Sequence, residues 1–192
     1  MGTHAETGRT GFRYADLASF PEDNLRREII DGELIVTTAP RTRHQRAVVK
    51  LGSALDAYSM VHGGEVFPAP TDVYLSDDNV VEPDVLFLRS DHVDRIEERY
   101  VKGAPDLIVE ISSPSTRQLE LVRKLNLYAR FGVPEYWYVD LEANRVEVYR
   151  LQGERYRQPE LVFPGERLET PLLPGFSISA EDALGARPAP AG

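Results

Sequence analysis

The chain has 192 residues, of which 42% are hydrophobic and 28% charged, as in an ordinary soluble globular domain with one substantial core. No apolar run approaches the roughly 20 residues that a membrane span requires, and the first residues, MGTHAETGRTGF, lack a signal-peptide apolar stretch. The chain has no cysteine, which excludes disulfides and thiolate metal sites and leaves oxygen and imidazole ligands. We therefore expect a cytoplasmic protein that does not enter membranes.

The charge is unevenly distributed along the chain. The formal net charge is −9, the wrong sign for a protein that holds nucleic acid by bulk electrostatics. Residues 71–98 contain nine Asp or Glu and two Arg, whereas residues 117–131 contain four Arg or Lys and one Glu. An acidic pocket beside a basic helix suits a divalent metal facing a phosphate. A solvated acidic face is the alternative that charge alone favours.

The first third of the chain predicts a disordered leader, a hairpin and a long helix. Residues 1–11 are polar and rich in Gly and Thr, so we expect them to be disordered, and residues 14–20 fit a short helix. Asp31-Gly32 between two β-rich runs predicts a type I′ hairpin, with Glu28 and Glu33 on adjacent strands near the turn. Residues 41–61 read as an amphipathic helix. His44 falls in its first turn, where a surface or capping role is the expectation.

The remainder alternates short strands with one more main helix. Strands are expected at 65–67, 72–75, 85–88, 106–112, 135–140, 145–150 and 176–178, with further strand near Tyr156, a surface helix or loop at 91–99 and a helix at 117–131. Ser179 to Asp182 is a capping-box pattern that opens a last short helix. We expect one domain over 12–184 and a disordered tail over 185–192. Mixed strands with two main helices indicate an α/β or α+β fold built on a central mixed sheet flanked by helices.

Three residues within this pattern are candidates for chemistry. Glu110 lies inside the apolar run LIVEI, where an unpaired carboxylate would cost several kcal/mol or change its pKa. Asp84 heads the apolar run VLFL, directly after Pro83. Lys124 lies at the edge of a helical apolar stripe, so its stem can follow apolar surface and leave its ammonium free. Asp84, Glu110 and Lys124 are therefore the candidate site.

The ordered motifs resemble a known family. IIDGEL, a helix with an early His, VEPDVLFL, PDLIVEISSPST, a helical Lys followed by Tyr, and GVPEYWYVD occur in this order. Together they resemble the Uma family of putative restriction endonucleases, within the PD-(D/E)XK nuclease superfamily, over roughly residues 12–180. The resemblance implies a PD-(D/E)XK nuclease-like core with a metal-dependent nuclease site.

The resemblance also implies roles for individual residues. Asp84 corresponds to the motif aspartate, Glu110 to the acidic residue of the next strand, and Lys124 to the lysine, which is moved from the strand to the following helix. The family pattern has an aspartate four residues before this lysine, and Glu120 stands there in this chain, which keeps a carboxylate but lengthens it by one methylene. Glu28 or Glu33 could complete the metal shell, and the family pattern favours Glu28.

Such a site would hydrolyse DNA phosphodiester bonds with Mg²⁺ or Mn²⁺. Asp84 and Glu110 supply hard oxygen ligands, and the backbone carbonyl of Ile111 is a further candidate ligand. The metal would acidify water and neutralise phosphate charge, and Lys124 would orient the water or stabilise developing negative charge.

Two alternatives stand beside this hypothesis. In the first, Asp84 caps a strand and Glu110 pairs with Lys124 in a buried ion-pair network, so that the fold is a non-catalytic module for binding a partner or nucleic acid. The net charge and Glu120 favour this alternative. A Ser hydrolase using Ser112 or Ser113 with His44 is disfavoured, because the chain has no Gly-x-Ser-x-Gly elbow.

We also expect a homodimer, on the grounds of the aromatic run Tyr136-Trp137-Tyr138 and the edge hairpin. A homodimer would provide two sites for cleavage of both DNA strands.

Overall fold

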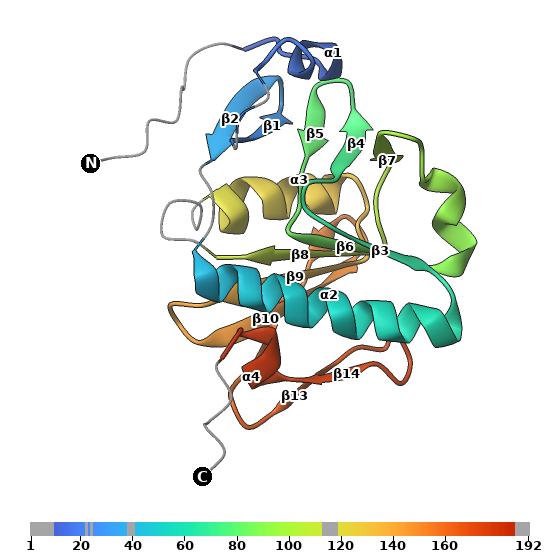
Figure 1. Cartoon of the computed structure of the whole chain (residues 1–192), viewed down its shortest axis with the longest axis vertical. Helices are drawn as coiled ribbons and strands as arrows, with labels where there is room; N and C mark the ends of the chain where they lie inside the picture. The colour runs from blue at the N-terminus through green and yellow to red at the C-terminus, as the bar shows by residue number, and fades with distance from the viewer. Residues whose placement is uncertain (1–9, 22, 24, 38–40, 113–118, 187–192) are drawn as a thin grey trace.

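The computed structural model of the chain describes residues 10–21, 23, 25–37, 41–112 and 119–186, with side chains from 121 onward in the last range. Figure 1 shows a larger central sheet with helix α2 on one side and α3 on the other. A smaller sheet stands beyond α3, and the C-terminal hairpin and α4 lie beyond α2. The predicted α+β architecture with a central mixed sheet is confirmed.

The central sheet has the strand order β11-β10-β9-β8-β6-β3, and β12 also pairs with β10. Its strands are β3 (Glu65–Pro68), β6 (Val85–Leu88), β8 (Leu107–Ile111), β9 (Glu135–Asp140), β10 (Arg145–Gln152), β11 (Arg155–Tyr156) and β12 (Glu160–Val162). β8 and β9 are parallel, whereas β6 and β8 are antiparallel. The helical crossover from β8 to β9 is what allows this parallel pair.

The smaller sheet has the order β2-β1-β5-β4-β7. Its strands are β1 (Arg26–Ile30), β2 (Glu33–Thr37), β4 (Asp72–Ser76), β5 (Asn79–Val81) and β7 (Tyr100–Lys102). Asp31 and Gly32 have φ values of 53° and 73°, so the predicted type I′ turn is confirmed. β5 and β7 were missed, because strands of three residues are too short to show an alternating pattern.

The helices are α1 (Tyr14–Leu17), α2 (Thr42–His62), η1 (Ser90–Arg95), η2 (Leu119–Lys124), α3 (Leu125–Arg130) and α4 (Ala180–Ala183). Ser179 caps α4 by accepting a hydrogen bond from the Asp182 backbone N–H, as its capping pattern predicts. The C-terminal hairpin pairs β13 (Arg167–Glu169) with β14 (Ser177–Ser179). No helix within the described ranges is long and apolar enough to cross a bilayer.

Two apolar cores lie on the two faces of the central sheet. Leu107, Val109 and Ile111 of β8 pack into the core on the α2 side, and Ile108 packs into the core on the α3 side. All five residues of β8 are buried, as its almost entirely apolar sequence predicts. Glu110 is the one charged residue in this strand.

The aromatic run of β9 lies inside these cores. Tyr136, Trp137 and Tyr138 are all 0% exposed, because β9 runs between β8 and β10. The strand that motivated the expected homodimer is thus a central strand, and its aromatic side chains are not available to a second copy. The homodimer stays a prediction that needs another contact surface.

Candidate functional site

The register of β6 and β8 brings Asp84 and Glu110 together. Val85 lies opposite Val109 in this antiparallel pair, so Asp84, one residue earlier, faces the position of Glu110 on the same side of the sheet. The Ile111 backbone N–H donates to Asp84 Oδ2 at 2.7 Å. Two residues 26 positions apart in the sequence therefore lie side by side at the end of two neighbouring strands.

Asp84 is buried and has three hydrogen-bond donors. Besides the Ile111 N–H, it accepts from Arg26 Nη2 on Oδ1 at 2.5 Å and from His44 Nε2 on Oδ2 at 3.0 Å. Burial alone would raise the pKa of Asp84, but the His44 hydrogen bond and the Arg26 charge outweigh it and hold that pKa below its usual value. Asp84 is therefore an ionised carboxylate.

The two carboxylate oxygens of Glu110 differ in their hydrogen bonding. Its Oε1 accepts from Lys124 Nζ at 2.8 Å and from the Tyr128 hydroxyl at 2.7 Å. Its Oε2 is buried and has no hydrogen-bond partner among the described residues. Burial raises the pKa of Glu110, and the charges of Asp84 and Glu28 add to this although Lys124 opposes it. A buried carboxylate oxygen without a donor is costly unless a cation or another donor meets it.

Lys124 bridges two buried carboxylates. Its side chain is 1% exposed, and Nζ lies 2.8 Å from Glu110 Oε1 and 2.7 Å from Glu28 Oε1. The prediction of a free ammonium at the edge of the apolar stripe was wrong. From Lys124 onward, where the π-helical segment η2 ends, the i, i+3, i+4 spacing places Lys124 on the same inward face as Leu127 and Tyr128, while Val122 is 53% exposed.

More acidic than basic groups meet here. The carboxylate cluster consists of Glu28, Asp72, Glu82, Asp84 and Glu110. Among the described residues, the groups that lower carboxylate pKa values within it are Arg26, Lys124 and the imidazole of His44. Burial, together with the charges of Glu28 and Asp72, raises the pKa of Glu82 to about 7 despite Arg26. Burial and Glu28 raise the pKa of Asp72 to about 6. The cluster is thus short of positive charge.

Sequence reasoning missed part of this cluster. His44 was expected at the surface, but it is 6% exposed and bonded to Asp84, because the first turn of α2 meets the end of β8 rather than solvent. Arg26, Asp72 and Glu82 were not candidates at all. Glu82 lies in the quoted motif VEPDVLFL, two residues before Asp84, and was the one with a sequence signal.

Some carboxylate oxygens of the site can accept a further contact. They suit a hard cation that takes only a few of its ligands from the protein. Two donors fill Asp84 Oδ2 and two fill Glu110 Oε1, whereas Asp84 Oδ1 has one donor and Glu110 Oε2 has none among the described residues. In the described part of the chain, no group of three or more His, Asp or Glu side chains is arranged to hold a metal. Mg²⁺ is commonly bound through only one or two carboxylates and keeps several waters, so this donor pair suits Mg²⁺.

The backbone at Ile111 faces the same place. The Ser112 N–H bonds to the Val139 carbonyl of β9, so the N–H and C=O of Ile111 are directed away from β9 and toward Asp84. This orientation is compatible with the carbonyl as a third oxygen ligand. Glu28 Oε1 already accepts from Lys124 and from the Glu82 N–H.

Comparison with known proteins decides the family. A family model described as Uma2, putative restriction endonuclease, matches residues 13–181. The chain belongs to the Uma2 family. The crystal structure of a putative nuclease belonging to DUF820 from Anabaena variabilis ATCC 29413 is similar, with a TM-score of 0.75 at 20% identity, covering 91% of this chain and 98% of that one. No curated protein matches the chain significantly.

The Uma2 assignment confirms the family named from the ordered motifs and, with the structural match, the restriction-endonuclease-like fold. A likeness at 20% identity carries the fold alone, so the roles of Asp84, Glu110, Lys124 and Glu28 remain predictions supported by their geometry. The side chain of Glu120 lies outside the described residues, and its predicted role stays with the sequence.

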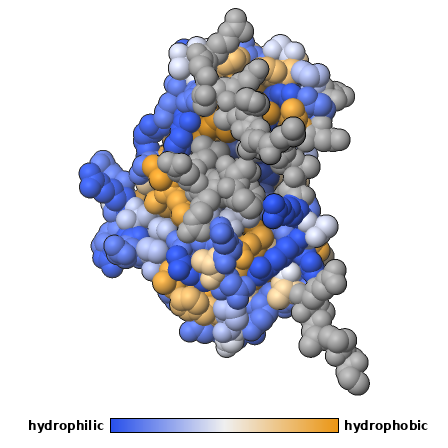
Figure 2. Space-filling model, turned by 90° about the vertical axis from the view of Figure 1, so that its left-hand side faces the viewer, coloured by the Kyte–Doolittle hydropathy of each residue, from blue (hydrophilic) through white to orange (hydrophobic). Residues whose placement is uncertain are grey.

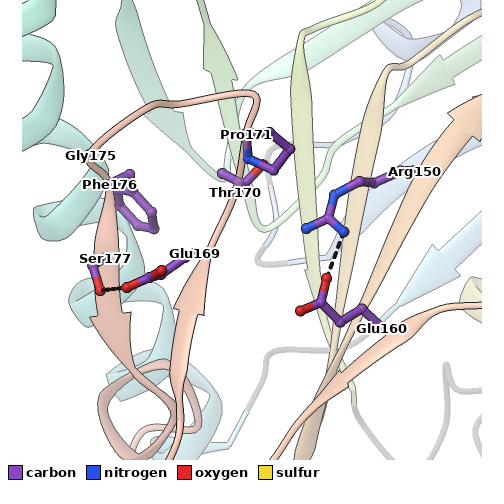
Figure 3. Close-up of a pocket in the computed structure, with 8 residues that line it drawn as sticks. All are labelled: Arg150, Glu160, Glu169, Thr170, Pro171, Gly175, Phe176 and Ser177. Atoms are coloured by element: carbon purple, nitrogen blue, oxygen red, sulfur yellow. Dashed lines mark hydrogen bonds and ion pairs between the residues drawn. The ribbon is translucent and has the colours of Figure 1, made fainter.

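A separate pocket does not belong to this site. It has a volume of about 430 Å³ and lies between β10, β12 and the β13–β14 hairpin (Figure 3). Its charged side chains already have partners, since Arg150 pairs with Glu160 and Glu169 accepts from the Ser177 hydroxyl. Arg150 also donates to the buried Glu135. The polar groups of the pocket therefore belong to a structural network of ion pairs and hydrogen bonds.

Proposed function

We propose that this Uma2-family protein is a Mg²⁺-dependent endonuclease that hydrolyses DNA phosphodiester bonds. The observation that carries the proposal is the pair of under-coordinated oxygens, Asp84 Oδ1 and Glu110 Oε2, in a buried cluster with surplus negative charge. A divalent cation between them would satisfy Glu110 and offset the surplus.

The roles follow from these contacts. Asp84 and Glu110 would hold the ion, with the Ile111 carbonyl beside them. The bound ion supplies Lewis acidity toward water and phosphate. Lys124 is held beside Glu110 by two short ion pairs, where its ammonium would orient the attacking water or stabilise charge developing on the phosphoryl group. The Tyr128 hydroxyl donates the second hydrogen bond to Glu110 Oε1.

A non-catalytic module is the second candidate. The specific observation in its favour is that Lys124 bridges Glu28 and Glu110 while Arg26 bridges Asp84 and Glu82, which is how a buried ion-pair network would be built. Metal binding separates the two candidates, because an ion-pair network needs no divalent cation.

The test measures Mg²⁺ or Mn²⁺ binding by calorimetry and cleavage of plasmid DNA. We expect cleavage with either metal and none in EDTA. Asp84→Asn removes a charged ligand and should abolish both binding and cleavage. Lys124→Met should keep metal affinity and lose cleavage, since an ammonium is no ligand for a cation. Because Lys124 is buried between two carboxylates, this variant is also expected to lose about 3–5 kcal/mol of stability.

Asp106→Asn is the matched control for Asp84→Asn. Asp106 is also a buried aspartate, at the opposite end of the β6–β8 pair. Like Asp84, it accepts hydrogen bonds from a backbone N–H, that of Arg89, and from a histidine, His92. Its replacement should lower stability to a similar degree while metal binding and cleavage remain. A parent protein that binds no divalent metal and cuts no DNA would reject the nuclease in favour of the binding module.

A further inference from the structure

Asp84 offers a metal only one oxygen. Oδ2 already accepts from the Ile111 N–H at 2.7 Å and from His44 Nε2 at 3.0 Å, which uses both of its lone pairs. Among the described residues, Oδ1 has a single donor, Arg26 Nη2 at 2.5 Å. A divalent cation that binds Asp84 must therefore approach the oxygen on which the Arg26 guanidinium lies.

Arg26 has a second carboxylate to hold it. It belongs to β1 of the smaller sheet, its side chain is 19% exposed, and Nε lies 3.1 Å from Glu82 Oε1. Glu82 is 16% exposed and lies two residues from Asp84. The guanidinium can therefore leave Asp84 Oδ1 and keep its contact with Glu82, so displacement does not leave a buried charge without a partner.

We propose that Arg26 is the internal counter-ion of the candidate metal site. In the metal-free protein its guanidinium holds Asp84. A divalent cation on the second lone pair of Oδ1 repels the guanidinium from that oxygen, and Glu82 then retains it. This inference rests on the proposed function, since it requires that Asp84 binds a metal.

The arrangement has two consequences for the protein. In the absence of metal, Arg26 keeps the ionised Asp84 compensated beside Glu110, so the two strand ends do not repel each other. In the presence of metal, binding of the +2 ion is weakened, because the ion has to displace the +1 guanidinium of Arg26 and the two cations repel each other over a few ångströms. Metal affinity is therefore set by competition between two cations for one oxygen.

The first experiment measures Mn²⁺ binding by calorimetry without DNA. Arg26→Met removes the competing charge and keeps an apolar stem of similar length, so we expect the affinity for Mn²⁺ to rise at least about tenfold. Arg27→Met is the matched control. Arg27 is the next residue of the same strand, but its guanidinium pairs with Asp23 outside the cluster, so its replacement should leave Mn²⁺ affinity unchanged.

The same variants are followed by thermal unfolding. In EDTA, Arg26→Met should unfold at a lower temperature than the parent, because Asp84 has lost its counter-ion, and saturating Mn²⁺ should restore a larger part of its stability than it adds to the parent. Arg26→Lys serves if the methionine variant does not fold. It keeps one positive charge but loses the two-nitrogen reach to Asp84 and Glu82, and its Mn²⁺ affinity should fall between those of the parent and Arg26→Met.

A crystal structure with Mn²⁺ gives the direct view. We expect Arg26 Nη2 beyond hydrogen-bond distance of Asp84 Oδ1 and Nε still on Glu82. If the parent binds Mn²⁺ and neither Arg26 variant binds it more tightly, the counter-ion role is overturned while the proposed function stands. If the parent binds no Mn²⁺, both are overturned.

Discussion

The titration of single side chains follows from the charge surplus of the carboxylate cluster. Glu82 and Asp72 have their pKa values raised to about 7 and about 6, first by burial and then by neighbouring carboxylates. Their folded-state pKa values exceed the ordinary ones, so the folded protein binds protons more tightly than the unfolded chain. The stability that this contributes is fully present below the unfolded pKa values and is lost as the pH rises through about 7.

We therefore expect the metal-free protein to be less stable at about pH 8 than at about pH 5. Glu82→Gln should reduce this fall by on the order of 1 kcal/mol, since solvent screens a partly exposed group. Urea unfolding in EDTA at the two pH values measures it. Glu154→Gln, at an exposed position, should leave the fall unchanged. An equal pH dependence in the parent and Glu82→Gln would contradict this account of Glu82.

At the scale of secondary-structure elements, the β1–β2 hairpin places the polar residues of the smaller sheet. β1 carries Arg26 and Glu28, and its pairing with β2 runs from Arg26 opposite Thr37 to Ile30 opposite Glu33. The turn needs two residues with positive φ. A Cβ at Gly32 would lie 3.2 Å from the Gly11 backbone nitrogen, so little space is left for a side chain at this position.

Gly32→Ala should destabilise the protein by about 1–2 kcal/mol, the cost of the left-handed conformation for a residue with a side chain. Gly52→Ala is the control. Gly52 lies within α2, and a Cβ there meets nothing within 4 Å, so alanine should stabilise by about 0.5–1 kcal/mol. Chemical denaturation of both variants measures the difference. Equal effects of the two substitutions would show that the turn conformation is not what Gly32 supplies.

The long elements and the hairpin could be predicted from the sequence, and the phase of the second helix could not. β8 could be predicted because LIVEI is apolar apart from Glu110, and the hairpin could be predicted because Asp-Gly has few conformational alternatives. The inward position of Lys124 is held by its ion pairs with Glu28 and Glu110, and a charged residue is not counted when an apolar helical stripe is traced in a sequence. The roles of Arg26 and His44 depend on long-range contacts with Asp84, which local patterns do not contain.

At the scale of the whole molecule, the proposed nuclease has to meet DNA with a net charge of −9. On the side shown in Figure 2, hydrophilic side chains cover much of the visible surface, and hydrophobic ones occur in separate groups. Bulk electrostatics would repel a phosphate backbone from such a molecule. A divalent cation in the site supplies local attraction at the place where phosphate would bind.

DNA binding should therefore depend on metal. With Ca²⁺ in place of Mg²⁺, we expect the affinity for a labelled duplex to be at least about tenfold higher than in EDTA at about 0.1 M salt. Fluorescence anisotropy measures this. Asp84→Asn should lose the Ca²⁺ effect, and Asp106→Asn should keep it. Equally tight binding in EDTA would mean that another surface holds the DNA.

The charge bridges between the two sheets also bear on the order of folding. Arg26 reaches Asp84 across 58 positions of the sequence, and Glu28 reaches Glu110 only through Lys124, which lies later in the chain than both. Closing such loops costs entropy before any contact repays it. The β1–β2 hairpin can form as soon as its own residues exist, whereas Arg26 has no Asp84 to pair with until residue 84 has been synthesised, and Glu28 has no Lys124 until residue 124 has been synthesised. During synthesis, the site should accordingly assemble later than the hairpin that carries Arg26 and Glu28.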